Sequence, residues 1–319
     1  MERATLICTE CLKSCPKHTQ GRRRLQITAT QTLKNYVEVT KPPIVFLLVF
    51  TSLATMIVAW RHTLIPFNLA LFAIALIAIT AASAGCDVLT CYIDRDIDAI
   101  MHRTKHRPIP SGRIGPRKAL AWGFALSIVG LLLAYWINLL SFLWIALGII
   151  DNVVVYSLYL KRRNPLNIIL GGVSGGLPVM FGWSALTNSV ALLPVLLAAL
   201  VVLWIPGHIW SLAIFTKEDY ERARVPMLPV VTKLSTALRC IVSTVVLMIP
   251  FSLWIYFEGR FGLIYLLVAS AFGVWALYTN LKLFLQPTKQ MAYAAFKVSS
   301  PYLFALFFGM IVDGFVRII

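Results

Sequence analysis

Three aspartates packed into one short stretch are the residues best placed to do chemistry. Asp94, Asp96 and Asp98 lie within five residues, at the end of an apolar run long enough to cross a bilayer. Asp94 and Asp98 are four residues apart, so a continuing helix places both carboxylates on one face. Two carboxylates on one face repel each other, and a bound divalent cation would offset this repulsion. Carboxylate oxygens are usual ligands of Mg²⁺. The spacing therefore predicts a magnesium site at this helix end.

A basic run follows the aspartates at once. Its members are Arg103, Lys105, Arg107, Arg113, Arg117 and Lys118. Magnesium-binding acids beside a cluster of cations make a site for a polyanion such as diphosphate. The alternative is a charged cytoplasmic loop of the kind that most membrane proteins have.

A second acidic stretch, Glu218, Asp219 and Glu221, ends another apolar run. If the two runs are neighbours, their acidic ends can hold one or two Mg²⁺ ions, with a diphosphate bridging the metals. A solvated charged loop is the alternative.

Polar residues also occur inside the apolar runs, and two of them are candidates for a function. His208 lies two to three helical turns inside its run, where substrate contact and structural packing are both open. Asp151 lies midway along another run, where a carboxylate costs about 2.5–3.5 kcal/mol on insertion scales. We expect Asp151 to face a cavity or a partner, or to stay protonated.

The composition shows what kind of elements must position these residues. The chain has 319 residues, of which 59% are hydrophobic and 13% charged, against about 25% charged in soluble domains. It is therefore a polytopic membrane protein. The formal charge of +16 does not indicate nucleic-acid binding, because the basic residues lie in short loops between apolar runs. Cys8, Cys11 and Cys15 resemble a zinc half-site, or belong to an unstructured extension.

Nine apolar runs are each compatible with about 20 helical residues. They cover residues 44–60, 68–93, 119–137, 140–160, 166–186, 190–215, 235–257, 261–284 and 293–316. Runs of this length without period-two alternation are helices. Lys and Arg concentrate in alternate loops, which places the N-terminus and both acidic stretches on the cytoplasmic side.

The two acidic stretches and the basic segments near them resemble the intramembrane prenyltransferases of the UbiA superfamily, and within it the protohaem farnesyltransferase (haem O synthase) group. The superfamily pattern Asn-x-x-x-Asp-x-x-x-Asp reads here as Thr90, Asp94 and Asp98. Further matches are Tyr92 to Asp98, Met101, Arg103 to Lys105, Arg107-Pro108, Thr40 to Pro42, Tyr156 to Gly172, and His208 to Pro229. They cover residues 40 to about 230. Departures from the pattern include Thr90 for the usual Asn, Pro43 for Arg and Gly207 for Pro.

The resemblance implies nine transmembrane helices around a central cavity. It implies transfer of a farnesyl group from farnesyl diphosphate to a vinyl carbon of protohaem IX (haem B), with addition of water, giving haem O for terminal oxidases. One or two Mg²⁺ ions would bridge the diphosphate. The implied metal ligands are Asp94, Asp98, Asp219 and Thr90. The implied diphosphate-binding residues are Arg103, Lys105, Arg107, Lys161 and Arg162. The implied catalytic residues are Asp94, Asp98, Asp219, Lys161 and His208.

For the domain organisation, we expect residues 1–40 to be a basic, flexible extension and residues 41–319 to be one transmembrane prenyltransferase domain. The expected location is the cell membrane, with the mitochondrial inner membrane as the alternative. Expected partners are haem B, farnesyl diphosphate and the bilayer, but no nucleic acid. Association with haem A synthase or oxidase assembly is a further expectation, and the oligomeric state is open.

Two other readings compete. The first is the same fold acting on another aromatic or tetrapyrrole acceptor, because the metal chemistry would be shared. The second is a polytopic transporter, which predicts charged residues on both membrane faces or along a pathway.

Overall fold

The computed structural model describes residues 29–63 and 65–316, and these residues form helices and no strand. The predicted all-α class is therefore confirmed for the described part of the chain. Two compact units are distinguished, residues 1–34 and residues 35–319. Only the start of helix α1 (Ala29–Glu38) is described in the first unit. Cys8, Cys11 and Cys15 lie outside the described residues.

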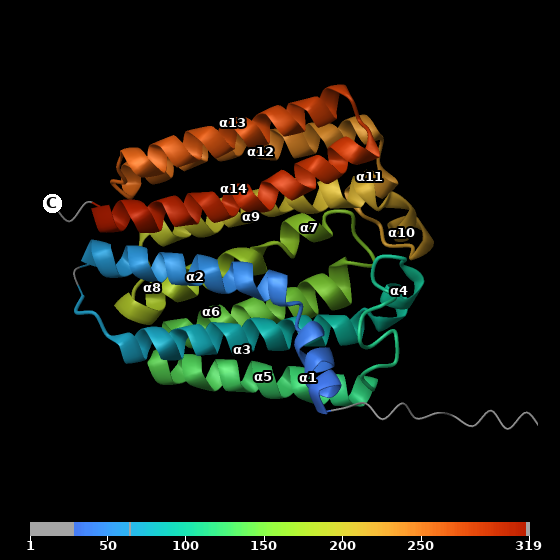
Figure 1. The fold of residues 1–319 in the computed structure, drawn as a ribbon, viewed down its shortest axis with the longest axis horizontal. Coiled ribbons are helices and arrows are strands. Elements are labelled where there is room, and N and C mark those ends of the chain that lie inside the picture. The colour runs from blue at the N-terminus through green and yellow to red at the C-terminus, as the bar shows by residue number, and fades with distance from the viewer. Residues whose placement is uncertain (1–28, 64, 317–319) are drawn as a thin grey trace, which may run out of the picture. The chain divides into compact units, whose positions relative to one another are not determined.

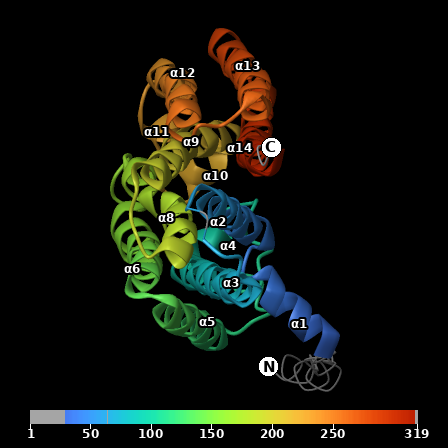
Figure 2. The same cartoon turned by 90° about the vertical axis from the view of Figure 1, so that its left-hand side faces the viewer.

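Nine of the described helical segments are long and apolar enough to cross a membrane, as predicted. They are α2 (Pro42–Thr63), α3 (Leu69–Ile93), α5 (Pro116–Ile137), α6 with η1 (Leu139–Leu160), α7 with α8 (Asn167–Thr187), α9 (Leu192–Phe215), α12 (Leu234–Glu258), α13 (Leu263–Leu285) and α14 (Lys289–Val316). In Figures 1 and 2 these helices run side by side.

Three short helices connect the spans at one end, on the right in Figure 1. They are α4 (Arg95–Ile100), α10 (Lys217–Arg222) and α11 (Leu228–Val231). The C-terminal ends of α2 and α14 lie at the other end. The residues singled out by sequence in α4 and α10 therefore lie at the same end of the helices.

Small residues allow α3 to lie against α5. A Cβ added to Gly85 would lie 2.5 Å from the backbone nitrogen of Ser127, and one added to Gly130 would lie 2.6 Å from that of Ala82. Backbones approach this closely only where side chains are absent. The contact fixes α3, which carries the aspartates at its end.

The fourth span departs from a regular α-helix. Its second half, Ile150–Leu160, is the π-helix η1, and the Lys161 amide continues the wider pattern by donating to Tyr156 O at 2.8 Å. A Cβ on Gly171 would lie 2.5 Å from the Tyr156 ring. Hydrophobic length predicts the span, but not this widening, which directs Tyr156 and Lys161 toward the end of α3. Such π segments often occur at functional sites.

Candidate active site

The end of α3 positions two buried carboxylates. The Asp94 amide donates to Thr90 O at 2.9 Å and the Asp98 amide donates to Asp94 O at 2.8 Å, so i→i+4 bonding continues from α3 into α4. Asp94 is 4% exposed and Asp98 3% exposed, while Asp96 between them is exposed. Asp94 and Asp98 therefore share the inner face of the helix end.

Each of these two carboxylates is paired with a base from another segment. Lys161 Nζ donates to Asp94 Oδ2 and lies 5.6 Å from the centroid of the Tyr156 ring. Arg107 donates to Asp98 Oδ2 at 2.8 Å. Asp94 Oδ1 is buried and has no hydrogen-bond donor. The pair Asp94–Lys161 thus leaves one acceptor oxygen open.

The surroundings keep both bases charged. Burial by itself would lower the pKa of Lys161, but Tyr156 and Asp94 raise it above its ordinary value. Burial would also lower the pKa of Arg107, and the Asp98 carboxylate reverses that effect and raises it. Two fixed positive charges therefore accompany the two buried carboxylates.

The exposed Asp96 forms a bidentate pair with Arg162 at 2.6 and 2.7 Å. Arg162 also donates to Ile93 O at 3.0 Å. The hydrogen bonds from Arg162 lower the pKa of Asp96. Since the pair is exposed, its contribution to stability is small, but it holds Arg162 close to Asp94. We call the end of the helices that carries Asp94, Asp98 and Asp219 the rim.

The second acidic stretch meets the first through Asp219. The His102 amide donates to Asp219 Oδ1 at 2.9 Å and the Arg103 amide donates to Asp219 Oδ2 at 3.0 Å. Arg222 also donates to Asp219 Oδ1. Burial tends to raise the pKa of Asp219, but the Arg103 and His102 amides and Arg222 lower it overall. The carboxylate thereby ties α10 to the loop that follows α4.

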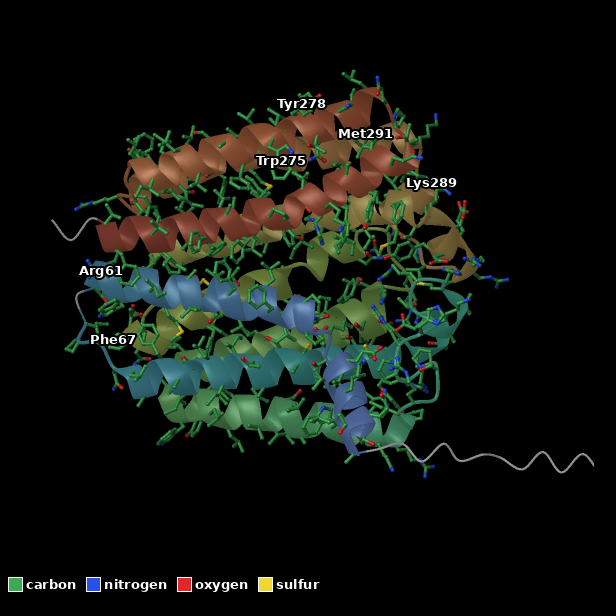
Figure 3. The ribbon with its side chains drawn as sticks, in the orientation of Figure 1. Arg61, Phe67, Trp275, Tyr278, Lys289 and Met291 are labelled. Atoms are coloured by element: carbon green, nitrogen blue, oxygen red, sulfur yellow. The ribbon has the colours of Figure 1, made fainter. Side chains whose placement is uncertain are left out.

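The other acids of the second stretch point to lysines. Glu218 accepts from Lys289 at 2.6 Å, and Glu221 lies 3.6 Å from Lys217; Lys289 marks this end of α14 in Figure 3. Within residues 29–63 and 65–316, no group of three or more His, Cys, Asp or Glu side chains is placed to hold a metal ion.

A further buried carboxylate, which was not predicted from the sequence, lies two turns deeper in α3. Asp87 is 6% exposed and accepts from Lys41 Nζ at 2.8 Å. The same Nζ donates to Thr90 Oγ1 at 3.0 Å, and Lys41 itself has the unusual φ of 53°. Asp87 Oδ2 is buried without a donor. A carboxylate inside an apolar run was the available signal, because such residues are rare and functional.

The Asp87 carboxylate borders a cavity of about 70 Å³ between α2, α3, α6, η1 and α8. Asn152 and Ser174 add polar atoms, and Trp144 and Phe181 are among the apolar walls. The cavity is a mainly apolar chamber next to Asp87, two helical turns before Asp94.

Asp151 has the partner that its position in a span led us to expect. Its Oδ2 accepts from the Ser174 amide at 2.8 Å, near the start of α8.

The basic residues expected to bind diphosphate differ in their exposure. Arg103 and Lys105 are exposed, whereas Arg107 and Lys161 are half-buried. Lys161, Arg107 and Arg162 are therefore held in place by carboxylates, while Arg103 and Lys105 lie on the open side of the loop that Asp219 fixes.

His208 lies in a separate environment between α9 and α14. Its Nδ1 is 2.5 Å from Ser299 Oγ, and its ring lies 4.4 Å from Trp204 and 4.5 Å from Phe296. It borders a cavity of about 20 Å³ with Asn280. In the described part of the chain, none of the hydrogen bonds or ring contacts of His208 reaches the carboxylates of α3 and α4.

The donor set at the end of α3 fits a magnesium ion. Mg²⁺ usually takes one or two carboxylates, with substrate phosphates and water as its other ligands. Asp94 and Asp98 supply two carboxylates on one face, and the open Oδ1 of Asp94 is a buried acceptor that lacks a partner. A cluster of three protein ligands is not needed for a site of this kind.

The pattern of the UbiA prenyltransferase family matches residues 47–308. The chain belongs to the UbiA prenyltransferase family. Its relatives include "Protoheme IX farnesyltransferase" of Desulforudis audaxviator, 53% identical over 289 residues, or 90% of each chain. Another, "Protoheme IX farnesyltransferase" of Thermoplasma volcanium, is 41% identical over 85% of this chain and 94% of that one.

Solved structures show the same UbiA fold. A digeranylgeranylglyceryl phosphate synthase covers 89% of this chain and 99% of its own, with a TM-score of 0.72 at 22% identity. A UbiA homologue from Archaeoglobus fulgidus bound to GPP and Mg²⁺ covers 87% and 99%, with a TM-score of 0.62 at 16% identity. The family resemblance inferred from sequence is confirmed, and the chain is a multi-pass membrane prenyltransferase.

Proposed function

We propose that this UbiA-family chain transfers a farnesyl group from farnesyl diphosphate to a vinyl carbon of protohaem IX, with addition of water, to give haem O. The observation that carries the prenyl-transfer chemistry is the buried pair Asp94 and Asp98, each facing a fixed base. An apolar cavity bordered by Asp87 lies two helical turns deeper along α3. The choice of substrates is supported by the relatives at 53% and 41% identity, which are named protoheme IX farnesyltransferases.

We assign Asp94 and Asp98 to the binding of one or two Mg²⁺ ions. The hydroxyl of Thr90 would add an oxygen where the family pattern has Asn. Asp219 is the third carboxylate assigned to the metal, and its bonds to the His102 and Arg103 amides give it a positioning role as well. When bound, Mg²⁺ neutralises the diphosphate and makes it a better leaving group.

The bases at the rim bind the diphosphate oxygens in this proposal. Lys161 and Arg107 are fixed beside the two buried carboxylates. Arg162 is held nearby by its ion pair with Asp96. The exposed Arg103 and Lys105 approach the outer oxygens from the loop. Lys161 exchanges its Asp94 partner for a phosphate oxygen as the substrate enters.

The cavity below the rim holds the reacting carbon away from water. Departure of diphosphate leaves an allylic cation, and nearby aromatic faces stabilise a cation by about 0.5–2 kcal/mol each. Trp144 and Phe181 line this chamber. Exclusion of water delays quenching of the cation until the vinyl group has attacked.

For His208 we propose a role in orienting the acceptor rather than in metal binding. Ser299 fixes one ring nitrogen, and Trp204 and Phe296 lie against the ring. We further propose that the membrane is the cell membrane with the N-terminus in the cytoplasm, and that residues 41–319 act as one prenyltransferase domain. Association with haem A synthase or oxidase assembly stays a prediction.

Mass spectrometry of haem tests this function directly. Purified protein is incubated with protohaem, farnesyl diphosphate and Mg²⁺, and the haem is then extracted. We expect the mass of haem O, formed by addition of one farnesyl group and one water. Asp98→Asn should form none, whereas the matched control Glu258→Gln, whose carboxylate lies at the other end of the helices, should retain wild-type turnover. Unmodified haem B from the wild-type protein would refute the assignment of the acceptor.

A further inference from the structure

A second charged cavity lies at the end of the helices opposite the rim of carboxylates. It has a volume of about 250 Å³ and is bordered by Arg61, Arg260 and Asp313 among others. Arg61 lies 20 residues after Lys41, so α2 separates the two by about 30 Å. Figure 3 shows Arg61 and Phe67 at one end of the helices and Lys289 at the other. The proposed prenyl transfer does not use this cavity.

Arg61 is held so that most of its donors remain available. Its Nε donates to Gly314 O at 3.0 Å, and its guanidinium lies 5.4 Å from the Trp60 ring and 6.0 Å from the Phe315 ring. A guanidinium has five N–H donors in a planar fork that matches phosphate oxygens. The backbone and the two rings thus fix the orientation of Arg61 without occupying the fork.

Arg260 is held at the mouth of the cavity by a strained turn. Its φ is 45°, a conformation that L-residues other than Gly rarely adopt. The turn is closed by the Arg260 amide, which donates to Phe257 O at 3.2 Å, and by the Phe261 amide, which donates to Tyr256 O at 3.1 Å. Glycine would adopt this turn without strain. Strained residues of this kind cluster at ligand sites.

Among the described residues that line the cavity, the arginines outnumber the carboxylates. Among the described residues neither Arg61 nor Arg260 forms an ion pair. The one carboxylate, Asp313, is 2% exposed and accepts from the Gly262 amide. Two guanidinium groups against one carboxylate give the described lining of the cavity a net positive charge.

We propose that this cavity binds the phosphate of an anionic phospholipid, in the leaflet opposite the diphosphate site. The cavity lies where α2, α12 and α14 end, so it meets the headgroup region of a bilayer. Basic pockets between transmembrane helices are suited to lipid headgroups. The chemistry shared with free phosphate is an anion held by two arginines. Beneath them, Ile57, Val58 and Met310 give the cavity an apolar wall, which favours an amphiphile over a free ion.

Thermal unfolding of the purified protein in a neutral detergent tests the proposal. We expect dioleoyl phosphatidylglycerol to raise the Tm of the wild type, and the zwitterionic phosphatidylcholine to raise it less. Arg260→Gln should raise the phosphatidylglycerol concentration for half of the Tm shift by about fivefold or more. Arg61→Gln/Arg260→Gln should remove the shift.

Two controls separate lost binding from lost folding. Arg239→Gln removes an exposed arginine from the opposite end of α12 and should leave the shift unchanged. No hydrogen bond from the Arg260 side chain is present in the described structure, so Arg260→Gln should fold normally. Arg61→Lys/Arg260→Lys keeps both charges and should retain part of the shift.

A shift that persists unchanged in Arg61→Gln/Arg260→Gln, or that is lost equally in Arg239→Gln, would overturn the site. Equal protection by inorganic phosphate alone would overturn its assignment to a lipid. Farnesyl transfer by Arg260→Gln should stay at the wild-type rate, so the outcome is independent of the proposed function.

Discussion

At the scale of single residues, the site consists of carboxylates matched one to one with bases. Lys41 pairs with Asp87, Lys161 with Asp94 and Arg107 with Asp98. The carboxylates of these pairs are buried, so loss of one partner leaves an uncompensated charge, which typically costs about 3–5 kcal/mol. In the proposed function, these ion pairs compensate the carboxylates before the diphosphate and its Mg²⁺ bind.

Lys161→Met should therefore destabilise the protein as well as weaken the binding of substrate. Asp94 would have no cationic partner and no donor to either oxygen. We expect a loss of about 3–5 kcal/mol, measured as a fall in Tm in detergent. Lys161→Met/Asp94→Asn should recover most of the Tm without recovering prenyl transfer. Full activity in Lys161→Met would show that this lysine does not bind the diphosphate.

The pair of Lys41 and Asp87 predicts a loss of stability in alkali. Burial alone would lower the pKa of Lys41, but Asp87 raises it above its ordinary value. The contribution to stability is thus fully present below the unfolded pKa of about 10.4 and is lost as pH rises through the raised folded value. Lys41→Arg keeps its charge at these pH values, so its Tm should fall less than that of the wild type as the pH passes 10.4. Identical curves would contradict this account of Lys41.

Residue types and spacing indicated most of the candidate residues that the structure brings together, but not their ion pairs and hydrogen bonds. The acids at i and i+4 and the basic run after them were visible in the sequence, since helical periodicity is local. Asp219 was expected as a metal ligand. In this structure its oxygens accept hydrogen bonds from two backbone amides in a loop more than a hundred residues away in the sequence. Long-range pairing of this kind depends on how the spans pack, which one sequence does not show. Asp87 was overlooked because it stands alone in an apolar run.

At the scale of elements, η1 and the glycine opposite it place Lys161. The π-helix ends at Leu160, and the Tyr156 ring fills the space in which a Cβ on Gly171 would lie. Hydrophobic length predicted where this span lies, but an extra backbone residue per turn leaves no mark on apolar composition.

Gly171→Ala should consequently displace the Tyr156 ring and, with it, Lys161. The added Cβ would lie 2.5 to 2.7 Å from three atoms of the Tyr156 side chain, and overpacking of this kind costs about 1–3 kcal/mol. We expect at least a tenfold fall in kcat/KM for farnesyl diphosphate, equivalent to about 1.4 kcal/mol. The matched control is Gly314→Ala, near the opposite end of the helices, whose Cβ would meet only the Arg61 side chain at 3.7 Å. Similar losses in both variants would remove the special role of Gly171.

At the scale of the whole molecule, the two ends of the membrane-spanning helices are assigned different functions. One end carries the carboxylates and bases assigned to prenyl transfer, and the other carries the cavity of Arg61 and Arg260. The nine spans of the described residues could be predicted, because the hydropathy of a segment depends on its composition alone.

Cysteine labelling in intact cells tests the proposed orientation. In a background without the six native cysteines, Ser111→Cys lies on the exposed loop between α4 and α5, and Ser189→Cys on the exposed loop between α8 and α9. A membrane-impermeant maleimide should label Ser189→Cys in intact cells and Ser111→Cys only after lysis. The reverse pattern would place the acidic rim on the outer face.

Asp94 and Asp98 are proposed to hold the diphosphate through Mg²⁺, which calorimetry with a non-reactive farnesyl thiodiphosphate can test. We predict binding to the purified wild-type protein that requires Mg²⁺ and falls at least a hundredfold in Asp98→Asn, while Glu258→Gln binds as the wild type does. Equal affinity with and without Mg²⁺, or undiminished binding by Asp98→Asn, would contradict the account.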